Sequence, residues 1–211
     1  MLIYRPWSAR TDLLHGFGAR GEPPSVPVAN ARQVHGTVVA IARAGETPEA
    51  DALLADGSGL GAAVVTADCV PVLLAACDRP LGAAVHAGWR GAAAGVVEAA
   101  LDALRARGAG AVEAVIGPAV GPCCYEVGPE VRDAFARRTG EVTSPAWSVR
   151  DGRLYLDLRT AVRRLLDAAG VAAVDVVGPC TACDRRYASY RRDGGGAGRQ
   201  TSFIAFATPQ A

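Results

Sequence analysis

Short apolar runs bounded by glycine, proline and aspartate recur along the chain, and this pattern most constrains its fold. Runs of this length, rich in alanine and β-branched residues, are typical of strands. Three longer segments carry apolar residues at helical spacing. The mixture predicts one α/β domain over residues 1–211. Strands are expected at 37–43, 51–55, 62–67, 70–76, 81–86, 112–117, 174–177 and 201–206, and helices at 92–107, 129–138 and 158–169.

The charge balance excludes several classes of function. The 22 basic and 21 acidic residues leave a formal charge of +1, which argues against broad attraction to nucleic acid or to an anionic membrane. All the basic residues are arginine, so a Schiff-base lysine and a phosphate-loop lysine are both excluded.

No secretory leader is visible at the N-terminus, and the longest apolar stretch, residues 59–76, is interrupted by Asp68 and Pro71. It is also too short to span a membrane. We therefore expect a soluble protein in the reducing cytoplasm, as a monomer or a homodimer. In that compartment the six cysteines are expected to be thiols, metal ligands or buried apolar residues rather than disulfides.

Two of the three histidines and one cysteine lie at predicted strand ends. His86 ends an apolar run, His35 comes just before one, and Cys69 lies between two such runs. Together they could supply a three-coordinate zinc site with an open fourth position. The alternative is that the cysteine is a buried apolar residue and the histidines are structural.

Four further cysteines form two pairs. Cys180 and Cys183 have the CxxC spacing of a redox pair or of half a four-cysteine zinc site. The other half would be Cys123 and Cys124, but neighbouring side chains are expected to diverge too far to share one ion.

Two segments could bind an anion such as phosphate. The turn 88–91 contains Arg90 and opens a predicted helix, whose N-terminus offers free N–H groups. The segment 187–196 contains Arg191 among tyrosines and glycines, which suits stacking and anion binding. The alternatives are a tight glycine turn and a solvated loop.

The chain resembles the YfiH/DUF152 family, which has been described as laccase-like and as purine nucleoside phosphorylases with adenosine deaminase activity. The segments HAGWRG (86–91) and CCYEVG (123–128) are the most specific. The matching segments run in order at 15–17, 33–36, 67–71, 86–91, 117–128, 157–159, 180–181, 189–193 and 198–200.

The resemblance implies an α/β/β/α sandwich and zinc on His35, Cys69 and His86, which would also be the catalytic residues. It implies purine nucleosides and phosphate as substrates, with Arg90 and Arg191 as candidates for orienting phosphate. A zinc ion with this ligand set keeps a positive charge and would activate water for deamination. Asp68, Glu126 and the activated water are all candidate proton donors.

This chain departs from the family pattern near the implied pocket. Gly18-Ala19-Arg20 replaces the usual Ser-Thr-Arg, the interval 21–31 is too short for the usual helix, and Val162 replaces an asparagine. These changes bear on substrate preference.

Three other functions compete with the nucleoside hypothesis. A multicopper oxidase needs many more than three histidines, so zinc is expected rather than copper. A cysteine hydrolase would use Cys69 as nucleophile and His86 as base, and could act in peptidoglycan editing. In a non-enzymatic protein, zinc would only fasten the fold.

Overall fold

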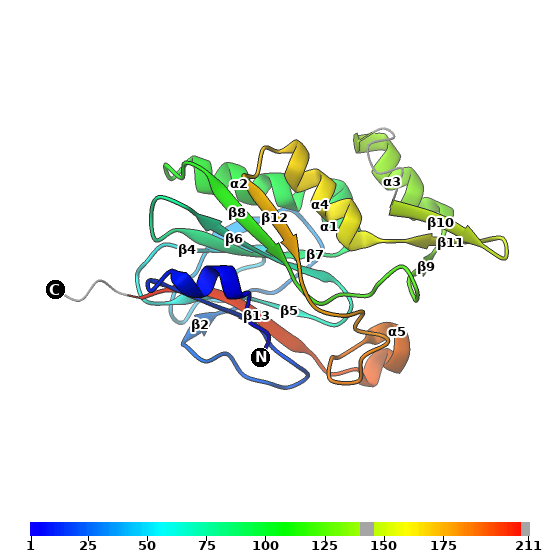
Figure 1. The fold of residues 1–211 in the computed structure, drawn as a ribbon, viewed down its shortest axis with the longest axis horizontal. Helices are drawn as coiled ribbons and strands as arrows, with labels where there is room; N and C mark the ends of the chain where they lie inside the picture. Colours follow the sequence, from blue (N-terminus) through cyan, green and yellow to red (C-terminus); the bar gives the residue numbers. More distant parts are fainter. Residues whose placement is uncertain (140–145, 208–211) are drawn as a thin grey trace.

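The computed structural model describes residues 1–139 and 146–207, and these form two stacked β-sheets with most of the longer helices on one side (Figure 1). The larger sheet is mixed and has six strands among the described residues. Their order is β12 (Ala173–Val176), β8 (Val112–Ile116), β6 (Val70–Ala76), β7 (Gly82–Ala87), β4 (Ala52–Ala55) and β3 (Val39–Ile41).

The second sheet packs on the face of the first that lies opposite the helices. Its described strands lie in the order β1 (Leu13–Phe17), β13 (Gln200–Phe206), β5 (Gly61–Thr66) and β2 (Val28–Ala29). A small antiparallel sheet projects from the end of the sandwich, with the order β10 (Trp147–Arg150), β11 (Arg153–Leu156) and β9 (Glu126–Val127).

The buried apolar residues form two clusters, one on each face of the larger sheet. Side chains that point alternately to the two faces of β6 contribute to both clusters. Val72 and Leu74 face the helices, whereas Leu73 faces the second sheet, and all three are fully buried. A strand buried on both faces needs apolar residues at every position, as the sequence has here. The helices are α1 (Trp89–Ala94), α2 (Val96–Arg105), α3 (Pro129–Thr139), α4 (Leu158–Ala168) and α5 (Tyr190–Asp193), with 3₁₀ turns η1 (Arg5–Ala9) and η3 (Gly194–Gly196).

The predicted α/β class with mixed sheets is confirmed, and so are most of the central elements. Asp157 caps α4 by accepting a hydrogen bond from the Thr160 N–H at 3.1 Å. Gly170 follows this helix with a φ of +75°. None of the described helices has both the length and the apolar character needed to cross a bilayer.

The predicted helix 92–107 is wrong in its boundaries, because the chain forms two helices here. The first begins earlier, at Trp89, and Gly95 separates the two with a φ of +107°. A Cβ atom at Gly95 would lie 1.9 Å from Nη1 of Arg138 on α3. The break therefore depends on a left-handed backbone that glycine adopts without strain.

Pro71 does not interrupt the sheet, although a proline cannot donate to a sheet ladder. It lies inside β6, opposite His86 in β7, and its carbonyl accepts a hydrogen bond from the Gly117 N–H at 2.9 Å. A proline is tolerated near the start of a strand, where its missing donor costs little. As a result, Cys69 is held at the edge of a rigid strand.

Candidate metal and substrate site

His35, Cys69 and His86 come together at one edge of the larger sheet. Because β6 and β7 are antiparallel, the start of one lies beside the end of the other, which brings Cys69 close to His86. The turn that precedes β3 adds His35. The candidate ligand atoms of all three lie within 4.8 Å of one another, and the two imidazole rings have centroids 4.8 Å apart.

Asp51 organises this cluster, and the sequence analysis missed it as a site residue. Its side chain is fully buried at the start of β4, and its Oδ1 lies 2.7 Å from Nδ1 of His86. The same carboxylate accepts hydrogen bonds from the backbone N–H groups of Val34, His35 and Gly36. A carboxylate on Nδ1 leaves Nε2 of His86 as the ligand atom, which is a common arrangement in metal sites.

The backbone around the cluster is shaped for close approach of the donor atoms. His35 has a φ of +60° and Asp68 a φ of +87°, both in the region that non-glycine residues rarely adopt. A Cβ atom at Gly88 would lie 2.7 Å from Nδ1 of His35 and 3.1 Å from Sγ of Cys69. Glycine at position 88 therefore leaves open the space in which these two donors meet.

The electrostatics of the cluster favour a thiolate. Burial raises the pKa of Cys69, but hydrogen bonds and charge from His35 and His86 outweigh this and lower it to about 7. Burial lowers the pKa of His86, but its interactions with Asp51 and Cys69 raise it to about 9. A thiolate beside two imidazoles is a ligand set that suits zinc.

Asp68 connects the turn of Cys69 to two distant segments. Its Oδ1 accepts a hydrogen bond from Oγ1 of Thr181 at 2.6 Å, and its Oδ2 accepts one from the backbone N–H of Arg191 at 2.6 Å. Both oxygens of this buried carboxylate are therefore engaged. This arrangement indicates that Asp68 positions neighbouring segments, rather than serving as the free proton donor considered above.

Both predicted anion-binding arginines influence Tyr125. Arg191 donates a hydrogen bond to the carbonyl of Glu126 at 2.7 Å, and its Cζ lies 5.4 Å from the centroid of the Tyr125 ring. Burial and the charge of Cys69 raise the pKa of Tyr125 to about 12, while Arg191 and Arg90 oppose that shift. Tyr125 therefore lies within electrostatic range of Cys69 and of both arginines.

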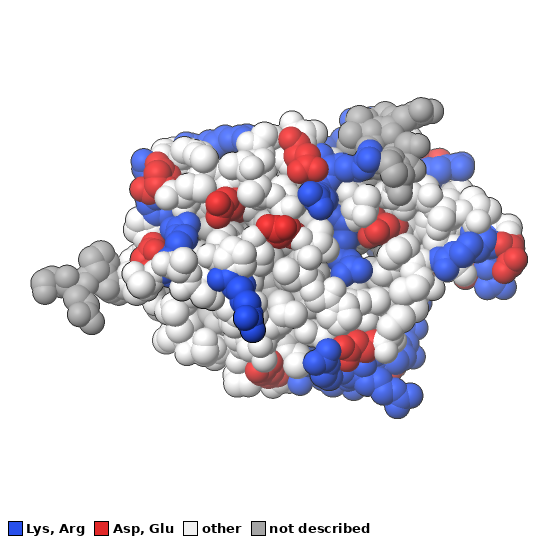
Figure 2. Space-filling view, viewed as in Figure 1, with Lys and Arg blue, Asp and Glu red and all other residues white. Residues whose placement is uncertain are grey.

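Arg90 is exposed in the first turn of α1, with its Cζ 4.4 Å from the ring centroid of Trp89. Because α1 has only six residues, its dipole is small, so any anion affinity here depends on the guanidinium groups. Figure 2 shows arginines gathered over α5 and mixed with acidic residues, while both signs are interspersed elsewhere on this face.

The side chains of Glu126 and His15 have other partners. The Glu126 carboxylate pairs with Arg153 at 3.2 Å. His15 is buried in β1, accepts a hydrogen bond from the Tyr4 N–H at 3.0 Å and packs edge-on against Trp7. This placement is that of a structural histidine.

Residues 16–207 match the family described as "Multi-copper polyphenol oxidoreductase laccase". The curated relatives carry another name. "Purine nucleoside phosphorylase" of Xylella fastidiosa is 42% identical over 181 residues, which cover 81% of this chain and 68% of that protein. A Pseudomonas aeruginosa protein of that description is 44% identical over 164 residues, or 76% and 66% of the two chains. The chain thus spans about two thirds of the length of both relatives.

Solved structures of YfiH and DUF152 proteins superpose on this chain. The hypothetical protein YfiH of Bacillus licheniformis superposes with a TM-score of 0.83 at 28% identity, covering 97% of this chain and 95% of that one. A DUF152 protein of Neisseria meningitidis gives 0.79 at 38% identity, covering 86% and 76%. On the motifs, the fold and these matches together, the chain belongs to the YfiH/DUF152 family.

Proposed function

We propose that this protein is a zinc-dependent purine nucleoside phosphorylase that also deaminates adenosine. Adenosine, inosine and methylthioadenosine would react with phosphate to give the free base and a sugar 1-phosphate. The observation that carries the proposal is the convergence of His35, Cys69 and His86 around Asp51, with all donor atoms within 4.8 Å. The relatives named purine nucleoside phosphorylase support the substrate class.

Three observations indicate that these residues are suited to binding zinc. Cys69 has a lowered pKa, Asp51 orients His86, and Gly88 keeps the space between the donors free of side-chain atoms. When bound, zinc supplies Lewis acidity that activates water and polarises a purine. Three protein ligands leave one coordination position open, which is typical of catalytic rather than structural zinc.

The protein side chains would supply the rest of phosphorolysis. A phosphate oxygen bonds to C1′ of the sugar as the bond from C1′ to the purine nitrogen breaks, and the base leaves with the electron pair. Arg90 and Arg191 would bind and orient the phosphate by charge-assisted hydrogen bonds. The Tyr125 ring, which both Cys69 and the two arginines influence, would position the nucleoside by stacking.

The proposal extends to a monomer or a homodimer in the cytoplasm. Cys69 must stay reduced to act as a ligand, so we place the protein in the cytoplasm.

The test is to incubate the purified full chain with adenosine, phosphate and zinc, and to identify the products. Adenine with ribose 1-phosphate reports phosphorolysis, and inosine reports deamination. Omitting phosphate should abolish only the first product. Cys69→Ala should abolish both, whereas Cys77→Ala, at an exposed thiol outside the site, should abolish neither. Formation of neither product by the zinc-loaded wild type would refute the proposal.

A cysteine hydrolase is the second candidate, and one specific observation favours it. Cys69, His86 and Asp51 form a chain of interactions like a nucleophile, a base and the carboxylate that orients it. Zinc on Cys69 would block this role. Cleavage of a peptidoglycan precursor or an ester that needs Cys69 but is inhibited by zinc would favour this candidate. Polyphenol oxidation stays the weaker alternative, because the chain has only three histidines.

A further inference from the structure

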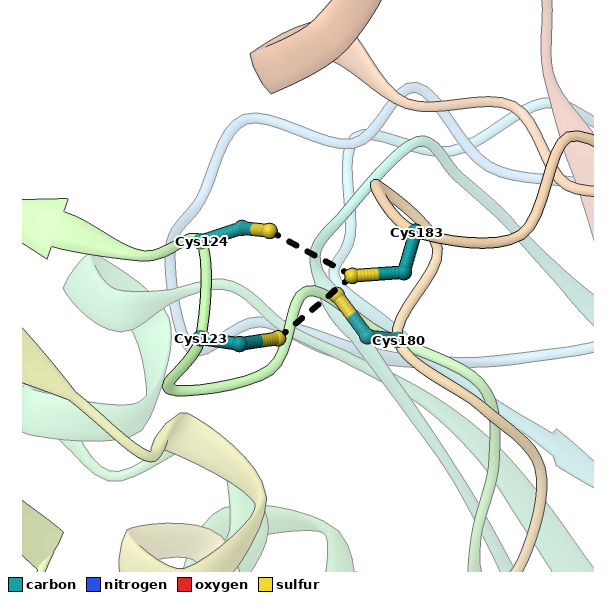
Figure 3. A group of neighbouring side chains, drawn as sticks. All are labelled: Cys123, Cys124, Cys180 and Cys183. Carbon is teal, nitrogen blue, oxygen red and sulfur yellow. Dashed lines mark hydrogen bonds between the residues drawn. The ribbon is translucent and has the colours of Figure 1, made fainter.

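Four cysteines outside the proposed active site converge on one point. Cys123 and Cys124 lie in the turn before β9, and Cys180 and Cys183 lie in the turn that follows β12 (Figure 3). The sequence analysis expected neighbouring cysteines to diverge, and this expectation was wrong. The Sγ atoms of Cys123 and Cys124 both point toward Cys183, at distances of 3.6 and 3.5 Å.

These sulfur distances match a tetrahedral metal site. Zinc–sulfur bonds of about 2.3 Å place tetrahedral sulfur atoms about 3.8 Å apart. The four sulfur atoms here lie within 4.8 Å of one another, and Sγ of Cys183 lies slightly closer than the tetrahedral value to Sγ of both Cys123 and Cys124. A disulfide needs about 2.0 Å, so these sulfur atoms are not bonded in pairs.

The backbone around the sulfur atoms is arranged as in zinc-binding turns. The Gly121 N–H points at Sγ of Cys180 at 3.1 Å, and the N–H groups of Cys183 and Asp184 both donate to the Cys180 carbonyl. A Cβ atom at Gly121 would lie 3.2 Å from Cβ of Cys180 and 3.4 Å from Sγ of Cys123. The absence of a side chain at Gly121 therefore lets the two turns approach closely.

Basic side chains lie next to this cluster, where a metal with four thiolates would leave two negative charges. Nη2 of Arg159 lies 3.5 Å from the position of a Cβ atom on Gly121. Arg150 donates a hydrogen bond to the Pro122 carbonyl, directly before Cys123. Guanidinium groups at these places would offset the charge of the occupied site.

We propose that Cys123, Cys124, Cys180 and Cys183 form a closed zinc site, separate from the one at His35, Cys69 and His86. With four protein ligands it has no open position, so its role is structural. Binding releases the thiol protons to solvent and involves no oxidation.

This second ion would fasten the turn at 117–125 to the turn at 178–184. The two turns already meet through the Thr181 N–H, which donates to the Ala119 carbonyl at 3.0 Å. The Thr181 hydroxyl in turn donates a hydrogen bond to Asp68, and Asp68 accepts another from the backbone N–H of Arg191. The site would therefore fix the segments that surround the proposed phosphate-binding residues.

The experiment measures zinc per chain in the whole chain and in matched variants. The wild type should hold about two zinc ions, and Cys180→Ser with Cys183→Ser should hold one. The triple variant His35→Ala, Cys69→Ala, His86→Ala should also hold one. In that triple variant, cobalt should give the intense visible and charge-transfer bands of tetrahedral thiolate coordination. Cys77→Ser is the control and should keep both ions.

Cysteine alkylation of the wild type, mapped by mass spectrometry, covers the case in which a variant fails to fold. Zinc should protect all four cysteines, while Cys77 reacts with or without it. Equal labelling of the four cysteines with and without zinc would overturn the proposal, and so would a disulfide among them in the freshly purified protein. Neither result depends on nucleoside activity, so this proposal and the proposed function can fail separately.

Discussion

Oδ1 of Asp51 lies 2.7 Å from Nδ1 of His86, and the same carboxylate accepts hydrogen bonds from the backbone of the turn that carries His35. One buried acid therefore fixes two of the three proposed zinc ligands. Burial raises the pKa of Asp51, but its hydrogen bonds from His86 and the turn outweigh this and lower it. The carboxylate stays ionised at neutral pH and holds His86 in the tautomer that a metal needs.

Asp51→Asn should weaken zinc binding by roughly 10- to 100-fold, because an amide of the same size carries no charge to orient His86. The measurement is a zinc titration in competition with a chromophoric chelator. Asp102→Asn is the matched control, since its side chain is 76% exposed. Equal zinc affinity in wild type and Asp51→Asn, with both proteins folded, would contradict this role.

Arg191→Ala should raise the apparent phosphate KM by about tenfold or more, because it removes charge-assisted hydrogen bonds to the anion. Arg90→Ala should act in the same direction. Zinc content should not change in either variant. Initial rates at varied phosphate concentration provide the measurement. Arg43→Ala is the control, because Arg43 is exposed and distant in sequence from both Arg90 and Arg191. An unchanged phosphate KM in both variants would remove these residues from the anion site, and a loss of zinc would make them structural.

The central strands could be predicted because their sequence pattern is local. The segment 70–76 is apolar at every position, and the structure buries all of β6 on both faces. The motif segments also indicated which histidines and cysteine to consider. What brings them together is the antiparallel register that places Pro71 opposite His86, and pairing of distant strands cannot be deduced from residue spacing.

Asp51 could not be recognised because its role depends on burial and on partners 15 to 35 residues away. An acid at the start of an apolar run was the one available signal. The hairpin of β10 and β11 did have a local signal, which the sequence analysis missed. Asp151 and Gly152 join these strands, both with positive φ, and Asp-Gly is a preferred pair for such a turn.

His15 should make stability depend on pH without affecting zinc. Burial lowers its pKa below the ordinary 6.5, and the ring nitrogen that accepts the Tyr4 N–H must be unprotonated to do so. The folded state therefore prefers the neutral ring. The contribution of the neutral ring to the free energy of unfolding is present in full above pH 6.5, and it is lost as the pH falls through the folded pKa.

The difference in free energy of unfolding between the wild type and His15→Gln should narrow below pH 6.5. It should narrow by at most about 1.4 kcal/mol for each pH unit. Urea unfolding at a series of pH values measures it. A gap that stays constant would show that His15 is not buried in its neutral form. A loss of zinc in His15→Gln would show that this histidine is not merely structural.

The reactivity of Cys69 in the zinc-free protein should distinguish it from an ordinary thiol. Alkylation requires the thiolate, so its rate rises with pH through the pKa of the group. For Cys69 the midpoint should lie near pH 7, because the lowering by His35 and His86 outweighs the effect of burial. Cys77, whose pKa burial raises above the ordinary 9.0, is an internal control in the same chain.

Two changes should then act on Cys69 and not on Cys77. His86→Asn should move its midpoint to higher pH, because the thiolate loses a hydrogen bond and the nearby positive charge. Zinc should suppress its alkylation, because the sulfur becomes a ligand, and should leave Cys77 unaffected. Mass spectrometry of labelled peptides at a series of pH values resolves the two sites. A Cys69 midpoint near that of Cys77 would mean that His35 and His86 do not activate this sulfur, which both candidate functions require.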